Sequence, residues 1–356
     1  MAETVPTIIL TTDPTRPDPA AIEQAAAVLR AGRLVAFPTE TVYGLGANAL
    51  SAAAIDRIYW AKQRPANDPI IAHIHDVAQL ATLAVNVSEA AYKLAESFWP
   101  GPLTLVLRRA DVVPANIAAG LDTVAVRMPS HDVARALLAA ADLPVAAPSA
   151  NTFTRPSATT AGHVMEDLDG RVDLILDAGP TTIGLESTVI DMTGDAPVVL
   201  RPGGATLDAL RSVLPGLQLS PRYVTDEATT SPGQMLKHYS PRARVIAYTG
   251  DDPAALLTAL TAAARAHVEA GRKVGVLVAD QDRDRFAGFA QTVRLGDGVH
   301  EISRRLFAAL RDLDHLGVDV ILVRDFGREG LGAAIWDRLL RAAEGDVVTV
   351  QGDDSA

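Results

Sequence analysis

The 356-residue sequence contains no cysteine, which excludes disulfide bonds, thiolate catalysis and zinc or iron–sulfur sites built on cysteine ligands. Aromatic residues are also scarce, at 4% of the chain, so alanine and leucine supply much of the 48% hydrophobic content. Basic residues are in deficit: 32 lysines and arginines stand against 43 aspartates and glutamates, for a formal net charge of -11. A broad nucleic-acid-binding face needs a basic surface. We therefore expect weak or no direct nucleic-acid binding.

Long apolar segments are absent as well. No apolar run approaches the roughly 20 residues that span a bilayer, and the start of the chain, MAETVPTIIL, lacks the basic-then-apolar order of a signal peptide. Neither the phosphate-binding sequence GxxxxGK(S/T) nor an internal repeat occurs. We therefore expect a soluble cytoplasmic protein that makes no membrane contact.

The sequence does contain a regular alternation of helical and β patterns, which predicts an α/β fold. The first predicted unit covers residues 15–212. Residues 213–242 are rich in proline, have no sustained periodicity and are long for a passive connector, so we interpret them as a linker with a function. Residues 243–350 form a second βα unit, which predicts a small parallel three-layer domain.

The periodicity places the elements of both units. In the first unit it predicts helices over 20–31, 51–63, 88–98, 131–141 and 206–214, and strands over 34–37, 70–74, 103–107, 123–127, 145–147, 174–176, 187–191 and 198–200. In the second unit it predicts strands over 245–248, 274–278 and 318–323, and helices over 253–270, 301–313 and 332–343.

The most informative segment is FPTETVYGLGA, residues 37–47. A β-rich apolar run ends at Pro38, and two threonines, Thr39 and Thr41, then flank the carboxylate of Glu40. Hydroxyls and backbone NH groups are thus concentrated where a strand ends, and open α/β sheets bind ligands at such positions. This segment predicts a polar cradle for a ligand.

Four cations stand at the ends of predicted helices or strands. Lys62 and Arg64 close a helix, whereas Arg127 and Arg201 each follow an apolar strand. An arginine that ends a buried strand needs an anionic partner, because a lone buried charge is costly. The alternatives are favourable charge at a helix C-terminus and pairing with structural carboxylates. Four such cations together favour an anion site. At the helix end, we expect loss of either charge to cost under about 1 kcal/mol of stability.

Two further motifs allow alternative functions. GLGANA, residues 44–49, formally fits the dinucleotide fingerprint of an oxidoreductase, but residues 38–43 separate it from the strand, and the fingerprint needs a tight strand-to-helix turn. His73 and His75 share one face of a predicted strand, which suits a metal, yet no third ligand is evident nearby. A histidine acting as a hydrogen-bond partner is favoured over a metal ligand.

Hydroxyl and amide side chains gather at other strand ends. Ser149 and Asn151 follow an apolar strand, Ser157 lies beyond them, and Ser187 begins another strand. Turn formation is the alternative role for such residues, and no GxSxG elbow surrounds Ser149 to make it a hydrolase nucleophile. Tyr239 lies in SPGQMLKHYSP, residues 231–241 of the linker, where a polar-aromatic cluster has no packing role and therefore favours covering of a ligand.

Taken in order, PTETVYGLG, KxRP, FWPGPLT, VRMP, APSAN, ESTV and LRPG resemble the motifs of the YrdC-domain family, and more specifically of its two-domain threonylcarbamoyl-AMP synthases. The resemblance implies a YrdC-like twisted mixed sheet with flanking helices, followed by a smaller Rossmann-like three-layer αβα domain. It also implies a nucleotidyltransferase that converts L-threonine, bicarbonate and ATP into threonylcarbamoyl-AMP and pyrophosphate. A partner transferase would then pass the threonylcarbamoyl group to an adenosine next to the tRNA anticodon.

The resemblance further implies roles for individual residues. Contacts with threonine fall on Thr41, His73, Arg127, Ala147 and Ser187. Contacts with ATP fall on Arg64, Asp68, Thr123, Ser149, Ser157, Arg201 and, from the linker, Tyr239. The catalytic group that gathers bicarbonate and phosphate oxygens would be Lys62, Arg64, Ser149 and Asn151. Magnesium is expected with ATP, its ligands are unknown, and no organic cofactor is expected.

The sequence departs from the family pattern at three places. Gln63 replaces a common glycine, Asp68 stands where asparagine is usual, and TFTRPSA after Asn151 differs from the usual NxSGxxSP. Rival functions are carbamoyl activation for hydrogenase maturation, a non-catalytic RNA-binding module and a nicotinamide-dependent oxidoreductase. The first uses a related domain with cysteine-rich zinc fingers, which a cysteine-free chain lacks, and the second needs basic surface that a net charge of -11 does not provide.

Overall fold

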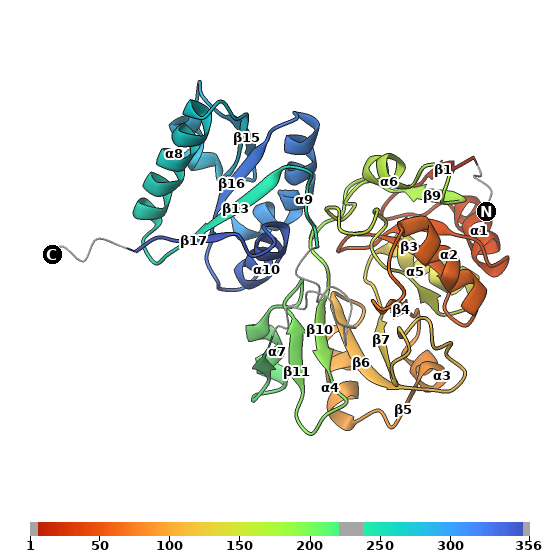
Figure 1. The fold of residues 1–356 in the computed structure, drawn as a ribbon. Coiled ribbons are helices and arrows are strands. Elements are labelled where there is room, and N and C mark those ends of the chain that lie inside the picture. Colours follow the sequence, from red (N-terminus) through yellow and green to blue (C-terminus); the bar gives the residue numbers. More distant parts are fainter. Residues whose placement is uncertain (1–5, 221–237, 352–356) are drawn as a thin grey trace. The chain divides into compact units, whose positions relative to one another are not determined.

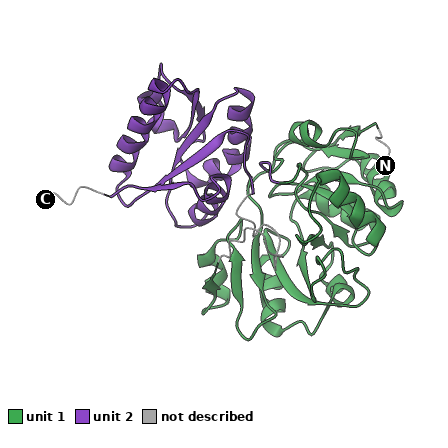
Figure 2. Cartoon of the chain, viewed as in Figure 1, with its two compact units in different colours: residues 1–153, 157–234 green, residues 154–156, 235–356 purple. Residues whose placement is uncertain are grey.

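The computed structural model describes residues 6–220 and 238–351. The chain divides into two units (Figure 2): residues 1–153 with 157–234, and residues 154–156 with 235–356. The second unit thus includes three residues of a loop whose two flanks belong to the first. Most of the predicted linker segment 231–241 lies outside the described residues, and only its last four, 238–241, are described.

The first unit is organised on a twisted, mixed 12-stranded sheet (Figure 1). Its strand order is β1-β9-β2-β3-β8-β4-β7-β6-β10-β11-β12, with β5 paired to β6. The strands are β1 (Ile8–Thr11), β2 (Val35–Pro38), β3 (Tyr43–Asn48), β4 (Ile71–His73), β5 (Ala84–Val85), β6 (Leu103–Arg109), β7 (Thr123–Arg127), β8 (Val145–Ala146), β9 (Leu174–Asp177), β10 (Thr188–Asp191), β11 (Val198–Arg201) and β12 (Gln218–Leu219).

Local capping explains where its helices begin. The Ser51 hydroxyl accepts from the Ala54 NH at the start of α2, and Ser88 and Thr206 cap α4 and α7 in the same way. These helices are α1 (Pro19–Arg30), α2 (Ala52–Lys62), α3 (Leu80–Leu83), α4 (Glu89–Phe98), α5 (Asp132–Ala141), α6 (Ala161–Leu168) and α7 (Leu207–Val213), with a 3-10 turn, η1, at Val77–Gln79.

The two faces of this sheet are covered unequally. Helices α2, α3, α4, α6 and α7 pack on one face, where their apolar residues join the main core. On the other face α1 and α5 cover only the half that contains β2, β8 and β9. The remaining half carries a small cluster contributed by strands alone: Ile71, Val106, Ala125, Val189 and Leu200. Among the described residues of the first unit, no helix contributes to this cluster.

The second unit is a five-stranded, all-parallel sheet in the order β15-β14-β16-β13-β17. Figure 1 shows α8 on one face and α9 and α10 on the other, which confirms the predicted three-layer domain. Its strands are β13 (Arg244–Thr249), β14 (Val274–Val278), β15 (Gln291–Arg294), β16 (Val320–Arg324) and β17 (Val347–Thr349), and its helices are α8 (Pro253–Glu269), η2 (Asp280–Phe286), α9 (Val299–His315) and α10 (Gly332–Ala342).

The predicted helices and strands are all present, with ends shifted by a few residues. The sequence pattern missed the buried strand β3, the helices α3 and α6, the 3-10 segments η1 and η2, and the short or exposed strands β1, β5, β12, β15 and β17. Strand β1 pairs with β9, more than 160 residues away, and β12 pairs with β11, so the first unit extends beyond the predicted 15–212 at both ends. These strands exist because of partners distant in sequence, which local periodicity does not reveal.

The glycines of GLGAN lie in strand β3, not in a strand-to-helix turn, so the dinucleotide fingerprint interpretation is wrong. Their small size serves packing. A Cβ on Gly46 would lie 2.8 Å from the Phe37 ring and 2.9 Å from a Val145 methyl, closer than side-chain contacts allow. Gly46 therefore lets β2, β3 and β8 approach one another closely.

We expect Gly46→Ala to destabilise the first unit by about 1–3 kcal/mol, because the new methyl group overpacks a closed core. Gly194→Ala is the matched control, since a Cβ there meets only the Ala196 carbonyl at 3.9 Å. Urea unfolding followed by circular dichroism measures both. Equal stability of the two variants would contradict the packing role of Gly46.

Candidate active site

One register row crosses five adjacent strands and carries the polar groups of the site. His73 pairs with Arg127, Arg127 with Thr104, Thr104 with Val189, and Val189 with Arg201. Residues directly opposite one another in a sheet point to the same face. The row therefore places His73, Thr104 and the two arginines above the strand cluster, on the half of the sheet that no described helix covers.

Arg127 is buried, and its guanidinium is held by several partners. Nη2 lies 2.6 Å from Glu40 Oε1, Nη1 donates to Thr41 Oγ1 at 2.9 Å, and Nε donates to the Gly101 carbonyl at 3.2 Å. The other Glu40 oxygen accepts from the Ser130 NH. The predicted anionic partner of this buried cation is thus a carboxylate of the protein, which fixes the orientation of the fork.

Thr41 lies in the turn between β2 and β3, and its hydroxyl is 2.8 Å from that of Thr39. The turn is tied to a second loop, since Ile183 and Gly184 donate their NH groups to the carbonyls of Glu40 and Thr41. The predicted cradle is therefore built from two loops distant in sequence, one from the PTET motif and one leading to the EST motif.

Ser187 precedes β10 and is fully buried beside the row. Its hydroxyl is 2.7 Å from that of Thr104, and its carbonyl accepts from Arg201 Nη2 at 2.9 Å. A Cβ on Gly203 would lie 2.4 Å from the Glu186 carbonyl, so the LRPGG loop packs directly on this segment. The motif FWPGPLT was noted from the sequence, but Thr104 within it was missed as a site residue.

Ser157 is also buried, and its hydroxyl donates to Glu186 Oε1. The sequence predicted Ser157 as an ATP contact but did not single out this glutamate, although ESTV was recognised as a motif. The pair joins the loop after Asn151 to the segment that carries Ser187.

Lys62 closes helix α2, as the sequence predicted, and its side chain is nearly inaccessible to solvent. Its ammonium group donates to the carbonyls of Ser149 and Asn151, and its own carbonyl accepts from the Phe153 NH at 2.8 Å. Burial, reinforced by the neighbouring Arg64, lowers the pKa of Lys62 well below its ordinary value. Truncation would leave two carbonyls without their donor, so the expected cost of under about 1 kcal/mol is too low.

Arg64 and Asp68 form a buried ion pair, with Nη2 2.8 Å from Oδ2. Arg64 also donates to the backbone carbonyls of Asp68 and Pro69. The carboxylate at position 68, where the family usually has asparagine, therefore neutralises Arg64. The contacts of Arg64 and Asp68 with ATP stay predictions.

His73 and His75 do not form the beginnings of a metal site. His73 is buried, with its ring perpendicular to that of Phe37 at 6.4 Å between ring centres, whereas His75 is partly exposed and lies 3.7 Å from Asp142. Across residues 6–220 and 238–351, no three His, Asp or Glu side chains are grouped as metal ligands. Burial, together with the charge of Arg127, lowers the pKa of His73 to about 3, so the ring is neutral at physiological pH.

The remaining predicted residues are more scattered. Ala147 follows β8, and its NH donates to the Ile71 carbonyl. Ser149 forms an isolated bridge with Gly44. Thr123 begins β7, at the opposite end of that strand from Arg127, so the structure does not bring these two together.

Tyr239 belongs to the second unit. It is buried, with its ring 5.1 Å from that of Phe307 and 4.0 Å from that of His238. The Arg338 guanidinium lies 5.3 Å from the Tyr239 ring centre. Contact of this side chain with a nucleotide stays a prediction.

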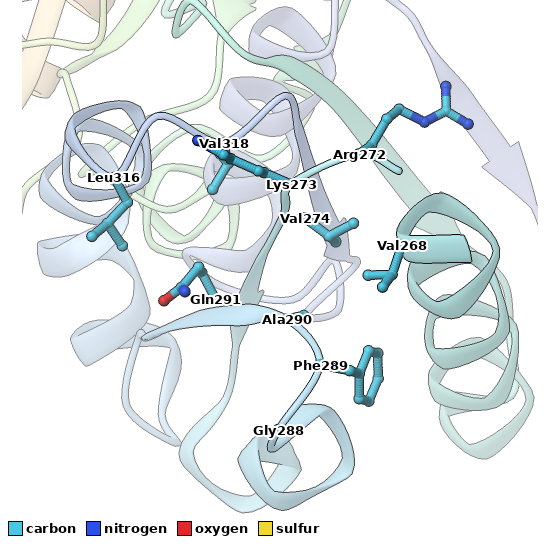
Figure 3. A pocket seen from close by; sticks show the side chains of 10 residues that line it. All are labelled: Val268, Arg272, Lys273, Val274, Gly288, Phe289, Ala290, Gln291, Leu316 and Val318. Atoms are coloured by element: carbon cyan, nitrogen blue, oxygen red, sulfur yellow. The ribbon is translucent and has the colours of Figure 1, made fainter. Parts of the chain in front are cut away.

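A separate cavity of about 690 Å³ lies in the second unit (Figure 3). Arg272, Lys273 and Gln291 are the polar side chains among its lining residues. It adjoins the first residues of β14 and β15, whereas ligands of parallel α/β sheets bind at the carboxyl ends of strands. None of the predicted site residues lines it.

Within the described ranges, no helix is long and apolar enough to cross a membrane.

Comparison with known proteins gives consistent matches for both units. Residues 27–203 match the model of a family described as "Telomere recombination", and residues 205–344 match "Threonylcarbamoyl-AMP synthase, C-terminal domain". The chain is 47% identical to the threonylcarbamoyl-AMP synthase of Pyrococcus abyssi, over 92% of this chain and 96% of that protein. It is 42% identical to the threonylcarbamoyl-AMP synthase of Bacillus subtilis, over 92% and 94% of the two chains.

A solved structure agrees with these matches. The crystal structure of Pyrococcus abyssi Sua5 complexed with L-threonine is similar to this chain with a TM-score of 0.91 and 44% identity, covering 97% of this chain and 100% of that one.

The fold and the buried polar row thus define a protein with a YrdC-type domain followed by a C-terminal α/β domain. The chain belongs to the threonylcarbamoyl-AMP synthase family.

The neutral, buried His73 predicts a specific dependence of stability on pH. Its pKa is about 3 in the folded protein against an ordinary 6.5, so the unfolded chain binds one more proton between these values. The free energy of unfolding should therefore fall as pH decreases from about 6.5 toward 3, by up to about 1.4 kcal/mol per pH unit. Urea unfolding of wild type and His73→Gln across pH 4–8 measures this. A difference between the two that does not change with pH would contradict the assignment.

Proposed function

We propose that this protein makes threonylcarbamoyl-AMP and pyrophosphate from L-threonine, bicarbonate and ATP, acting as a nucleotidyltransferase. The main support is the similarity, at a TM-score of 0.91 over nearly the whole chain, to a relative solved with L-threonine. Names of relatives from an archaeon, a bacterium and a yeast, at 39–47% identity, agree with this function.

The proposed reaction joins two substrates at phosphorus. Threonine and bicarbonate first give N-carboxythreonine and water. A carbamate oxygen of that compound then attacks the α-phosphorus of ATP, the bond from this phosphorus to the bridging oxygen breaks, and pyrophosphate leaves. No side-chain nucleophile is needed, so the protein contributes positioning of the reactants and stabilisation of charge on the phosphoryl oxygens.

Threonine is proposed to bind along the register row. Arg127 is suited to its carboxylate, because a fixed guanidinium can donate two parallel hydrogen bonds. Glu40 holds that guanidinium in place at 2.6 Å, so a second carboxylate would have to share the remaining donors or displace it. Neutral His73 and the hydroxyls of Thr41 and Ser187 supply hydrogen bonds without adding charge.

ATP is proposed to use the cationic side of the site. Arg201 carries charge suited to the phosphates, Arg64 would donate hydrogen bonds to them while paired with Asp68, and Lys62 holds the loop that bears Ser149 and Asn151. Magnesium would arrive with the triphosphate as part of that substrate. A tRNA-modifying threonylcarbamoyl transferase would consume the adenylate, and the cytoplasm would be the place of both steps.

The central test is pyrophosphate release by the purified full-length protein. Release should require ATP, threonine and bicarbonate together, because the attacking carbamate forms only from the last two. Release that continues without threonine would indicate ATP hydrolysis and would overturn the proposed reaction.

We expect Arg127→Lys and Arg201→Lys to separate the two substrates. Lysine keeps the charge but loses the forked donor geometry, so each change should weaken its own ligand by roughly tenfold. Threonine affinity should fall mainly in the first variant and ATP affinity mainly in the second, as measured by calorimetric titration. Arg304→Met, at an exposed position of α9, is the control for nonspecific effects. Equal losses for both ligands in both variants would contradict the separate roles.

A further inference from the structure

The loop between Asn151 and Ser157 passes through both units. Residues up to 153 and from 157 onward pack with the first unit, but residues 154–156 pack with the second. This is the segment TFTRPSA, whose sequence departs from the family pattern. Asn151 and Ser157, at its two ends, are residues proposed to act on ATP and the phosphate oxygens.

Each of the three residues is held by the second unit. Arg311 of α9 donates through Nη2 to the Pro156 carbonyl at 2.6 Å. Arg155 lies 3.4 Å from Asp314 Oδ2, and the Ser240 NH donates to the Thr154 carbonyl at 2.7 Å.

The holding groups are themselves well fixed. Arg311 is fully buried, and the Asp314 side chain is 3% exposed. Asp314 also accepts from the NH groups of Arg242 and Ala243, just before β13. Arg311 and Asp314 are three residues apart on α9 and so lie on the same side of that helix. One helix therefore presents both groups to the loop.

The conformation of the loop supports a constrained role. Thr154 has φ of 69°, a left-handed conformation that is unusual for a β-branched residue. Strained backbone persists where surrounding contacts enforce it, and such positions concentrate at functional sites. On the first-unit side the loop is equally tied, since the Phe153 NH donates to the Lys62 carbonyl at 2.8 Å and Ser157 bonds to Glu186.

We propose that Arg311, Asp314 and Arg155 are positioning residues for ATP binding, through which helix α9 of the C-terminal unit sets the geometry of Asn151 and Ser157. Only chain continuity is needed to transmit this: Thr154 is three residues from Asn151, and Pro156 is adjacent to Ser157. The inference rests on the proposed function in assigning ATP to these two residues. It gives the C-terminal domain a role in ATP binding by the first unit, and this role does not require the C-terminal domain to bind a ligand itself.

The test compares Arg311→Met and Arg155→Met with the control Arg304→Met, an exposed arginine on the same helix. Methionine keeps much of the aliphatic stem and removes the donors. By calorimetric titration of the full-length protein, both test variants should bind ATP with magnesium roughly tenfold more weakly, because small displacements of binding groups are costly. Threonine affinity should change by less than about twofold, since the hydrogen bonds described above for residues 154–156 involve no residue assigned to threonine. The control should behave as wild type.

A second readout separates positioning from simple loss of stability. Amide hydrogen exchange of a peptide covering 152–157 should accelerate in both test variants before any change in the β13–β17 sheet. If Arg311→Met does not fold, the more exposed Arg155→Met decides the outcome. Wild-type ATP affinity in a folded variant, or equal loss for ATP and threonine, would overturn the proposal.

The outcome is independent of adenylate formation. A selective loss of ATP affinity, in a protein that releases no threonine-dependent pyrophosphate, would support the positioning role and reject the proposed reaction. If the wild type releases pyrophosphate but the variants bind ATP with unchanged affinity, the proposed reaction would be supported and the positioning role would be rejected. Absence of ATP binding by wild type would overturn both.

Discussion

The buried charge of Arg127 is the constraint on which the site depends. A guanidinium at the end of a central strand is stable only with a nearby anion, and removal of one partner of such a pair costs about 3–5 kcal/mol. Glu40 supplies that anion from the turn between β2 and β3, at 2.6 Å. The ion pair therefore fixes the PTET turn over the sheet, and the NH groups of the loop at 183–184 then attach to that turn.

The other buried cations also need partners, and each has a different one. Arg64 is neutralised by Asp68, Arg201 is held by the Ser187 carbonyl, and Lys62 donates to two carbonyls of the loop at 149–151. Burial, reinforced by the neighbouring Arg64, lowers the pKa of Lys62 well below its ordinary value. A site that gathers several cations at the ends of strands and helices is suited to an anionic ligand.

The arrangement of helices on the large sheet determines where these charged residues lie. Helices cover one face of the large sheet and half of the other, and the polar row lies on the remaining half. The C-terminal unit adds a parallel sheet whose helix α9 holds three residues of a loop that runs between Asn151 and Ser157.

The sequence by itself determined the α/β class, the order of the motifs and the family, because periodicity, caps and contiguous motifs are local properties. It also singled out several of the buried polar residues, among them Arg127 and Arg201, since a charge that directly follows an apolar strand can be recognised in the sequence. Thr104 and Glu186 became apparent only in the tertiary structure, because their importance comes from partners more than 25 residues away. Burial of Lys62, the pairing of Arg64 with Asp68 and strand β1 were likewise decided by long-range packing, which sequence spacing does not encode.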